Sequence, residues 1–118
     1  MKKYLAILAV AMFGVGCETN TYEDLLDEEV PSGAITYNAN VKSIIDANCA
    51  SCHSQGGTAS FRLLTNYAEV KAAVENAGLL DRIQRQNGEP GLMPQTGRMP
   101  QDKINTILEW NTQGLPEN

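Results

Sequence analysis

The sequence is poor in the residues that most protein metal sites require, with one histidine and three cysteines among 118 residues. A structural zinc site takes four Cys or His ligands, and only three remain if Cys17 belongs to the N-terminal export signal. Basic residues are few as well. The sequence has 9 Lys and Arg against 14 Asp and Glu, and no stretch is rich enough in basic residues to form a patch. These shortages argue against a zinc fold and against binding to nucleic acid.

The scarce ligand residues are nevertheless concentrated in one place. Two of the three cysteines and the sole histidine fall in five consecutive positions, Cys49-Ala50-Ser51-Cys52-His53. This is the pattern C-x-x-C-H, at which c-type haem is attached covalently. Its spacing lets each thiol add to one vinyl group of the same porphyrin, and the next residue then brings an imidazole under the iron. The motif predicts one covalent haem c per chain, with His53 as an iron ligand.

Two other interpretations of the cysteine pair agree less well with the sequence. A thioredoxin-like dithiol follows a strand and opens a helix, whereas the residues before Cys49 have a helical pattern. A strained local disulfide between Cys49 and Cys52 would leave His53 without a role.

The N-terminus has the pattern of an exported lipoprotein. Lys2 and Lys3 precede an apolar run of ten residues, too short to span a bilayer and typical of a signal peptide. The run ends in small residues before Cys17, which resembles a bacterial lipobox, although Gly14 replaces the usual Leu. We expect residues 1–16 to be the signal peptide and Cys17 to be lipidated. The alternative is an ordinary signal peptide that contains a cysteine.

The next segment differs in composition from the rest of the chain. Six acids and no base lie between Glu18 and Glu29, followed by Pro31, Ser32 and Gly33. Such a stretch buries too little apolar surface to order itself. It predicts an acidic flexible tether over residues 17–34, or an acidic arm for a partner, ahead of one domain over residues 35–118. Export and a lipid would place that domain on the periplasmic or cell-surface side of a bacterial membrane.

Within the domain the apolar spacing is helical, and no segment alternates as a strand should. One apolar face before the motif comprises Tyr37, Val41, Ile44 and Ile45, with Asn38 as the expected N-cap. A second stripe comprises Tyr67, Val70, Val74 and Ala77, with Asn66 as N-cap and Gly78 at the C-terminal end. We therefore predict an all-α fold.

Two further helices and a long loop complete the expected domain. A short helix should cover Leu79–Gln86, and the last helix Gln101–Gln113, with Ile104, Ile107, Leu108 and Trp110 on its apolar side. Residues 89–97 are too rich in Pro and Gly to form anything but a loop.

The order helix, C-x-x-C-H, middle helices, M-P-x-x-G loop and terminal helix resembles a class I c-type cytochrome over residues 36–115. The specific parts are Cys49, Cys52, His53 and the loop Met93-Pro94-Gln95-Thr96-Gly97. The resemblance implies a small helical domain wrapped around the haem, with its first and last helices crossing. It leaves unidentified the carbonyl that usually holds the other nitrogen of the axial imidazole.

The resemblance also bears on the sixth iron ligand. With one histidine a bis-His haem is impossible, and after signal removal Met93 and Met99 are the only thioethers. Met93 lies in the loop where family members place this ligand. Met99 has a structural explanation, because with Pro100 as N-cap it forms a hydrophobic staple with Ile104. We therefore expect His53 and Met93 to ligate the iron.

The implied function is one-electron transfer by a monomeric carrier that is not itself an enzyme but serves redox partner proteins or a partner oxidoreductase. Four arginines are candidates for neutralising the haem propionates: Arg62, Arg82, Arg85 and Arg98. The alternatives are a peroxidase or a gas or redox sensor with a labile distal ligand, and copper handling by Met93, Met99 and the cysteine pair. The chain has no second histidine to supply distal acid and base chemistry.

Overall fold

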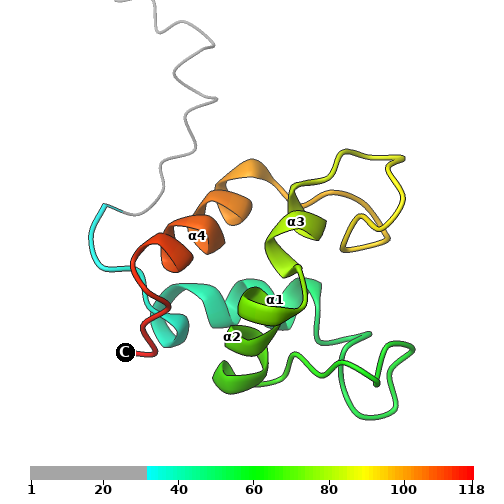
Figure 1. Ribbon diagram of the computed structural model, residues 1–118, viewed down its shortest axis with the longest axis horizontal. Helices are drawn as coiled ribbons and strands as arrows, with labels where there is room; N and C mark the ends of the chain where they lie inside the picture. The colour runs from blue at the N-terminus through cyan, green and yellow to red at the C-terminus, as the bar shows by residue number, and fades with distance from the viewer. Residues whose placement is uncertain (1–31) are drawn as a thin grey trace, which may run out of the picture.

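The computed structural model describes residues 32–118. Within this range the chain forms a π-helical turn and four α-helices: η2 (Tyr37–Val41), α1 (Lys42–Asn48), α2 (Tyr67–Asn76), α3 (Leu79–Gln84) and α4 (Gln101–Thr112). No strand occurs among these residues, which confirms the predicted all-α class (Figure 1). The predicted signal peptide, lipidated Cys17 and nearly all of the tether lie outside the described residues.

The first helical segment has the predicted apolar face but a different start. Tyr37, Val41, Ile44 and Ile45 are all buried, as their spacing indicated. The N-cap is Thr36, whose hydroxyl accepts a hydrogen bond from the Ala39 amide at 3.2 Å. The prediction that Asn38 caps this segment is therefore wrong, because a wide π-helical turn precedes α1 and shifts the start of the helical segment toward the N-terminus.

The second helix begins as predicted. The Asn66 side chain accepts a hydrogen bond from the Glu69 amide at 3.0 Å and caps α2. Gly78 follows the helix with φ of 65°, a left-handed conformation that glycine adopts without steric cost, and α3 starts at the next residue. This helix ends at Gln84, two residues before the predicted end, because Arg85 is extended.

The core forms where α4 packs against η2. Ile104, Ile107 and Trp110 are fully buried on α4, and the Trp110 and Tyr37 rings lie 5.9 Å apart between centroids. The predicted contact between the first and last helical segments is thus present, and η2 is the part of the first segment that contacts α4. The Trp110 indole donates to the Pro116 carbonyl at 2.8 Å, so its polar atom is satisfied and its role is structural, as predicted.

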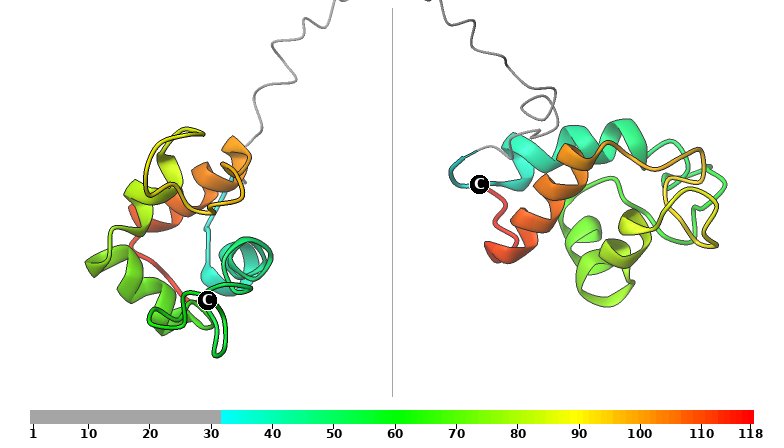
Figure 2. Two further views of the ribbon diagram at one scale, coloured as in Figure 1. Left: turned by 90° about the vertical axis from the view of Figure 1, so that its right-hand side faces the viewer. Right: turned by 90° about the horizontal axis from the view of Figure 1, so that it is seen from above.

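The two ends of the described chain pair with each other. The Tyr37 and Asn38 amides donate to the carbonyls of Pro116 and Glu117 at 2.9 and 3.0 Å. The Gln113 side chain accepts from the Ile35 amide at 2.8 Å. The loops that follow α1 and α3 lie at the opposite end of the molecule, and Figure 2 shows both from two further directions.

Candidate functional site

The C-x-x-C-H sequence forms a compact turn directly after α1. The Cys49 amide closes the helix on the Ile45 carbonyl at 2.8 Å. The Cys49 carbonyl then accepts from the amides of Cys52 and His53 at 3.2 and 3.0 Å. The helix and this turn together fix the order in which the two thiols and the imidazole leave the backbone.

The two cysteines are free thiols in different surroundings. Cys49 is partly buried and packs against the core, whereas Cys52 is exposed. Burial, with a smaller contribution from nearby Cys52, raises the pKa of the Cys49 thiol to about 11. Cys49 therefore stays a neutral thiol at physiological pH, and Cys52 is the one that solvent reaches.

The loop after the motif folds back over it. The Cys52 carbonyl accepts from the Ala59 amide at 2.9 Å, and the His53 carbonyl accepts from the Leu64 amide at 2.9 Å. Gly57 passes so close that a Cβ there would lie 2.3 Å from the Cys52 carbonyl oxygen. Only glycine permits this approach, so residues 54–64 are shaped to hold the motif in place.

This loop also orients the imidazole. His53 Nδ1 lies 2.8 Å from the main-chain carbonyl oxygen of Arg62. A carbonyl oxygen can only accept, so Nδ1 carries the proton and Nε2 presents its lone pair. Arg62 thus provides the carbonyl that the sequence left unidentified. A main-chain acceptor has no side-chain signature, so no sequence pattern could have found it.

The predicted sixth ligand lies in the other loop at the same end of the molecule (Figures 1 and 2). Met93 is partly buried and does not belong to the main core, and its amide donates to the Arg82 carbonyl at 3.1 Å. Met99 is only 3% exposed and belongs to the same core cluster as Ile104, while Pro100 caps α4. Met99 is therefore a core residue, in line with the predicted hydrophobic staple, and Met93 is the thioether not required by the core.

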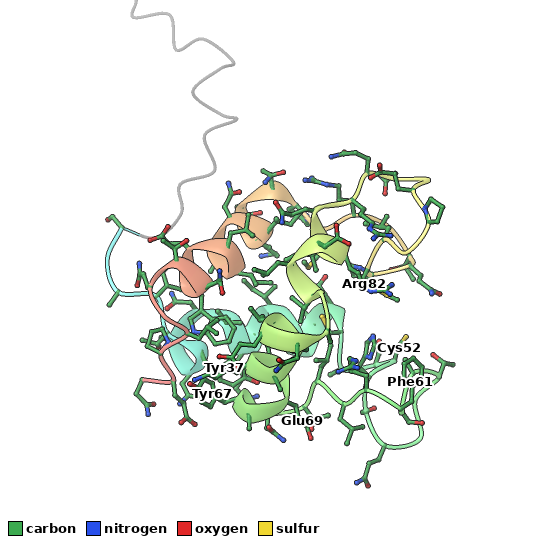
Figure 3. All side chains as sticks on the ribbon, in the orientation of Figure 1. Tyr37, Cys52, Phe61, Tyr67, Glu69 and Arg82 are labelled. Carbon is green, nitrogen blue, oxygen red and sulfur yellow. The ribbon has the colours of Figure 1, made fainter. Side chains whose placement is uncertain are left out.

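The four arginines have different surroundings. Arg82 and Arg85 donate to the main-chain carbonyls of Gly91 and Pro90 in the loop before Met93. The Arg98 guanidinium reaches Gln101 Oε1 at 2.6 Å, and its Nε is buried without a hydrogen-bond partner. Figure 3 shows Arg82 toward the same end of the molecule as Cys52. Arg62 acts through its carbonyl, as described above.

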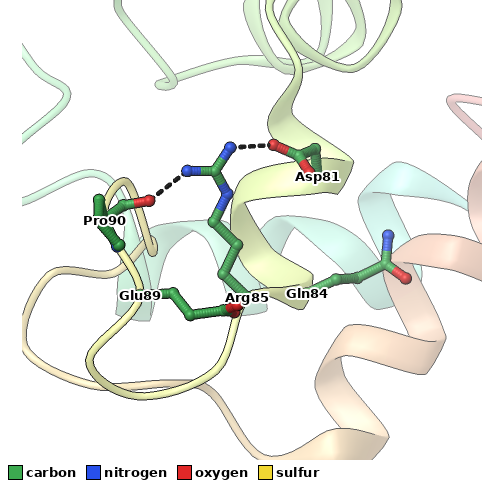
Figure 4. A pocket seen from close by; sticks show the side chains of 5 residues that line it. All are labelled: Asp81, Gln84, Arg85, Glu89 and Pro90. Carbon is green, nitrogen blue, oxygen red and sulfur yellow. Dashed lines mark hydrogen bonds and ion pairs between the residues drawn. The ribbon is translucent and has the colours of Figure 1, made fainter.

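Two surface features lie at the end of the molecule where the loops after α1 and α3 are found. Phe61, in the loop that covers the motif, is 86% exposed, a large apolar side chain open to solvent beside the predicted haem attachment (Figure 3). Asp81, Gln84, Arg85, Glu89 and Pro90 line a shallow hollow between α3 and the following loop (Figure 4).

The residues that the structure describes hold no group of three or more His, Cys, Asp and Glu side chains arranged to bind a metal ion. Over the same range, no helix has both the length and the apolarity to cross a membrane. No family model, curated protein or solved structure matches the chain.

The residues of this site fit a c-type haem. That group requires two thiols on one turn, an imidazole next to them with a free nitrogen, and a second axial donor from elsewhere. The turn of residues 49–53 provides the first two, with Nε2 of His53 left available by the bond to Arg62. The third is a thioether in the case of Met93, a known partner of His in c-type cytochromes, and the loop that contains it lies at the same end of the molecule as the loop after α1 (Figure 1).

Proposed function

We propose that this protein is a mono-haem c-type cytochrome that carries single electrons, with its haem held by Cys49 and Cys52 and its iron ligated by His53 and Met93. The observation that carries the proposal is the contact between His53 Nδ1 and the Arg62 carbonyl at 2.8 Å. Iron-ligating histidines commonly bond their second nitrogen in this way, which fixes the ring and its tautomer. The same contact leaves Nε2 as the nitrogen that can donate to iron.

A bound haem would supply the redox chemistry, through the ferrous and ferric states of its iron. The chain's own residues would keep the two donor side chains in place. The Arg62 carbonyl holds the imidazole, and the Arg82 carbonyl holds the Met93 amide. Donors held in advance need little rearrangement when the iron changes charge, which favours fast electron transfer. A His and Met pair favours a comparatively high reduction potential.

Residues outside the described range would give this carrier its location. We propose that residues 1–16 direct export and that a lipid on Cys17 anchors the protein to a bacterial membrane. The acidic segment up to residue 34 would then link that anchor to the haem domain. In this arrangement the domain works as a monomer that exchanges electrons with redox partner proteins.

Intact-mass spectrometry of the protein produced in a host that matures c-type cytochromes tests the proposal. We expect a mass increase of one haem that survives denaturation, since thioethers are covalent. The Cys49→Ala/Cys52→Ala variant is the control and should lose this mass. A wild-type protein that is exported and folded but carries no haem, or carries it without covalent attachment, would contradict the proposal.

A further inference from the structure

The loop that contains Met93 is attached to α3 and to Arg85 by side-chain and main-chain hydrogen bonds. We call residues 89–93 the Met93 loop. Arg82 is bonded to it twice: its Nη1 donates to the Gly91 carbonyl at 3.4 Å, and its own carbonyl accepts from the Met93 amide at 3.1 Å. These contacts fall on Met93 itself and on the residue two positions before it.

Arg85 makes the neighbouring attachment. Its Nη1 donates to the Pro90 carbonyl, and its Nη2 pairs with Asp81 one helical turn back at 2.5 Å (Figure 4). The Glu89 carboxylate accepts from the Gln86 amide at the start of the loop. Asp81 thus orients the Arg85 guanidinium from α3 while the guanidinium holds the loop.

Gly91 makes the approach of both guanidinium groups possible. A Cβ at this position would lie 2.3 Å from Arg85 Nη1 and 3.2 Å from Arg82 Nη1. Gly91 also has φ of +82°, which disfavours any other residue. The two arginines and this glycine therefore form one arrangement, in which the guanidinium groups occupy the space that a side chain would fill.

We propose that Arg82 and Arg85 are positioning residues that hold the Met93 thioether at the iron and so set how readily another ligand displaces it. The proposal rests on the function proposed above. A loop already held in its ligating conformation loses little entropy when the thioether binds. When the guanidinium contacts are removed, the loop gains other conformations and the Met93 thioether competes less well.

The proposal differs from the propionate role expected of these arginines. Each guanidinium uses an Nη1 donor on a loop carbonyl, and Arg85 uses a second donor on Asp81. These contacts fix the loop by directed hydrogen bonds, whereas a propionate partner acts mainly through its charge. The two roles predict different results for a substitution that leaves both arginines unchanged.

The test is an imidazole titration of the ferric holoprotein. Binding is measured from the loss of the sulfur-to-iron charge-transfer band at the red edge of the visible spectrum. Arg82→Leu and Arg85→Leu should each tighten apparent imidazole binding about fivefold, the effect of one net hydrogen bond. Gln84→Leu is the matched control, because Gln84 lies in the same helix as Arg82 and its side chain donates back to the Leu80 carbonyl of that helix at 2.9 Å. It should leave the imidazole affinity unchanged.

Two variants separate positioning from charge and from general instability. Asp81→Asn releases Arg85 without removing either arginine, and it should also weaken the hold on Met93. Gly91→Ala should tighten imidazole binding in the wild type and add less in the Arg82→Leu/Arg85→Leu background, where the guanidinium contacts are already gone and only the backbone strain of the positive φ remains. Urea unfolding of each variant, followed by far-UV circular dichroism, reports any loss of overall stability.

The outcomes distinguish the two proposals. A wild-type protein without the charge-transfer band refutes Met93 ligation, and with it both the proposed ligand set and the positioning role. If the wild type has the band but the arginine variants bind imidazole no more tightly than Gln84→Leu does, the positioning role alone is refuted. The arginine variants could also bind imidazole more tightly while Asp81→Asn and Gly91→Ala do not. That result would refute the positioning role and assign the arginines to charge interactions instead.

Discussion

At the scale of the residue, the chemistry of His53 depends on a single main-chain contact. The bond to the Arg62 carbonyl at 2.8 Å fixes the proton on Nδ1 and makes Nε2 a better donor to a metal. The same imidazole without this contact would exchange between two tautomers and two ring orientations. The loop of residues 54–64 therefore fixes the imidazole in the orientation that leaves Nε2 free to donate, as the proposed iron ligation requires.

The two methionines lead to a prediction about the sixth ligand. Met93→Ala should abolish the sulfur-to-iron charge-transfer band of the ferric protein and open the iron to cyanide, because the other thioether of the described residues, Met99, is packed in the core. Met99→Leu should keep the band and cost less than about 1.5 kcal/mol, as a nearly isosteric change in the core. Absorption spectra and urea unfolding of the two holoproteins provide the measurement.

Met99→Leu is also the control for Met93→Ala, since both variants remove one thioether from the same domain. Loss of the band in Met99→Leu together with its retention in Met93→Ala would reverse the assignment. It would also conflict with the burial of Met99, which is 3% exposed.

The cysteine pair yields a second prediction at this scale. In the haem-free protein at pH 8, iodoacetamide should alkylate Cys52 much faster than Cys49, because only the thiolate reacts and burial raises the Cys49 pKa to about 11. Peptide mass spectrometry over a time course measures both rates. In urea the difference should disappear as the core around Cys49 opens. Equal rates in native buffer would contradict the different surroundings of the two thiols.

At the scale of the element, α2 has an N-terminal cap whose strength depends on pH. Two hydrogen bonds from Thr65, through its amide at 2.7 Å and its hydroxyl at 2.8 Å, are the main causes that hold the pKa of Glu69 below its usual value. The charged carboxylate therefore stabilises the fold above the unfolded-state pKa. This contribution is lost as the pH falls through the lower folded-state pKa.

The resulting prediction concerns Glu69→Gln. At pH 7 this variant should be less stable than the wild type by up to about 1 kcal/mol, a small effect because the site is solvated. The difference should be smaller at pH 3 than at pH 7, because protonation of the wild-type carboxyl increases as the pH falls toward its lowered pKa. Urea unfolding at the two pH values measures it, with Glu75→Gln on the same helix as control. A difference that stays constant with pH would exclude the carboxylate as its source.

The elements also show what the sequence could and could not predict. Helix positions followed from apolar spacing, and the Asn66 cap followed from residue type, because both depend on neighbours in the sequence. The π-helical turn and the early end of α3 at Gln84 were missed, since backbone geometry at Thr36 and Arg85 decides them. The contacts of His53 and Met93 with main-chain carbonyls were missed too, as such acceptors exist at every residue.

At the scale of the whole molecule, one aromatic cluster joins the first and last elements. Tyr37, Tyr67 and Trp110 lie with ring centroids 5.6 to 6.3 Å apart, and the Tyr67 hydroxyl donates to the Leu115 carbonyl at 2.8 Å. Edge-on contacts of this kind stabilise beyond the area they bury. Its two tyrosines lie away from Cys52, as the labels in Figure 3 show.

Trp110→Ala should therefore lower the free energy of unfolding by about 3 to 5 kcal/mol through loss of buried surface and creation of a cavity. Trp110→Phe should cost less, since a ring still fills part of the space. Urea unfolding followed by far-UV circular dichroism measures both changes. The charge-transfer band should persist in the folded Trp110→Phe protein, and its loss there would show that the cluster and the Met93 loop are coupled.

A further prediction at this scale concerns Cys17, which lies outside the described residues. Cys17→Ser should leave haem attachment and the absorption spectrum unchanged while moving the protein from the membrane fraction to the soluble fraction, because the lipid acts only as an anchor. Membrane fractionation with haem staining measures this. Loss of haem from an exported Cys17→Ser protein would show that the three cysteines do not divide their roles in this way.

The pairing of the chain ends also determines how the domain responds to mechanical load. Residues 33–38 are bonded to residues 113–117, at the end of the molecule opposite the loops that carry His53 and Met93. A force applied through the N-terminal segment reaches these hydrogen bonds first, and they lie beside the aromatic cluster. The loops of the ligand site are not on the direct path of that force. Pulling should therefore rupture the terminal contacts while the surroundings of His53 and Met93 still keep their shape.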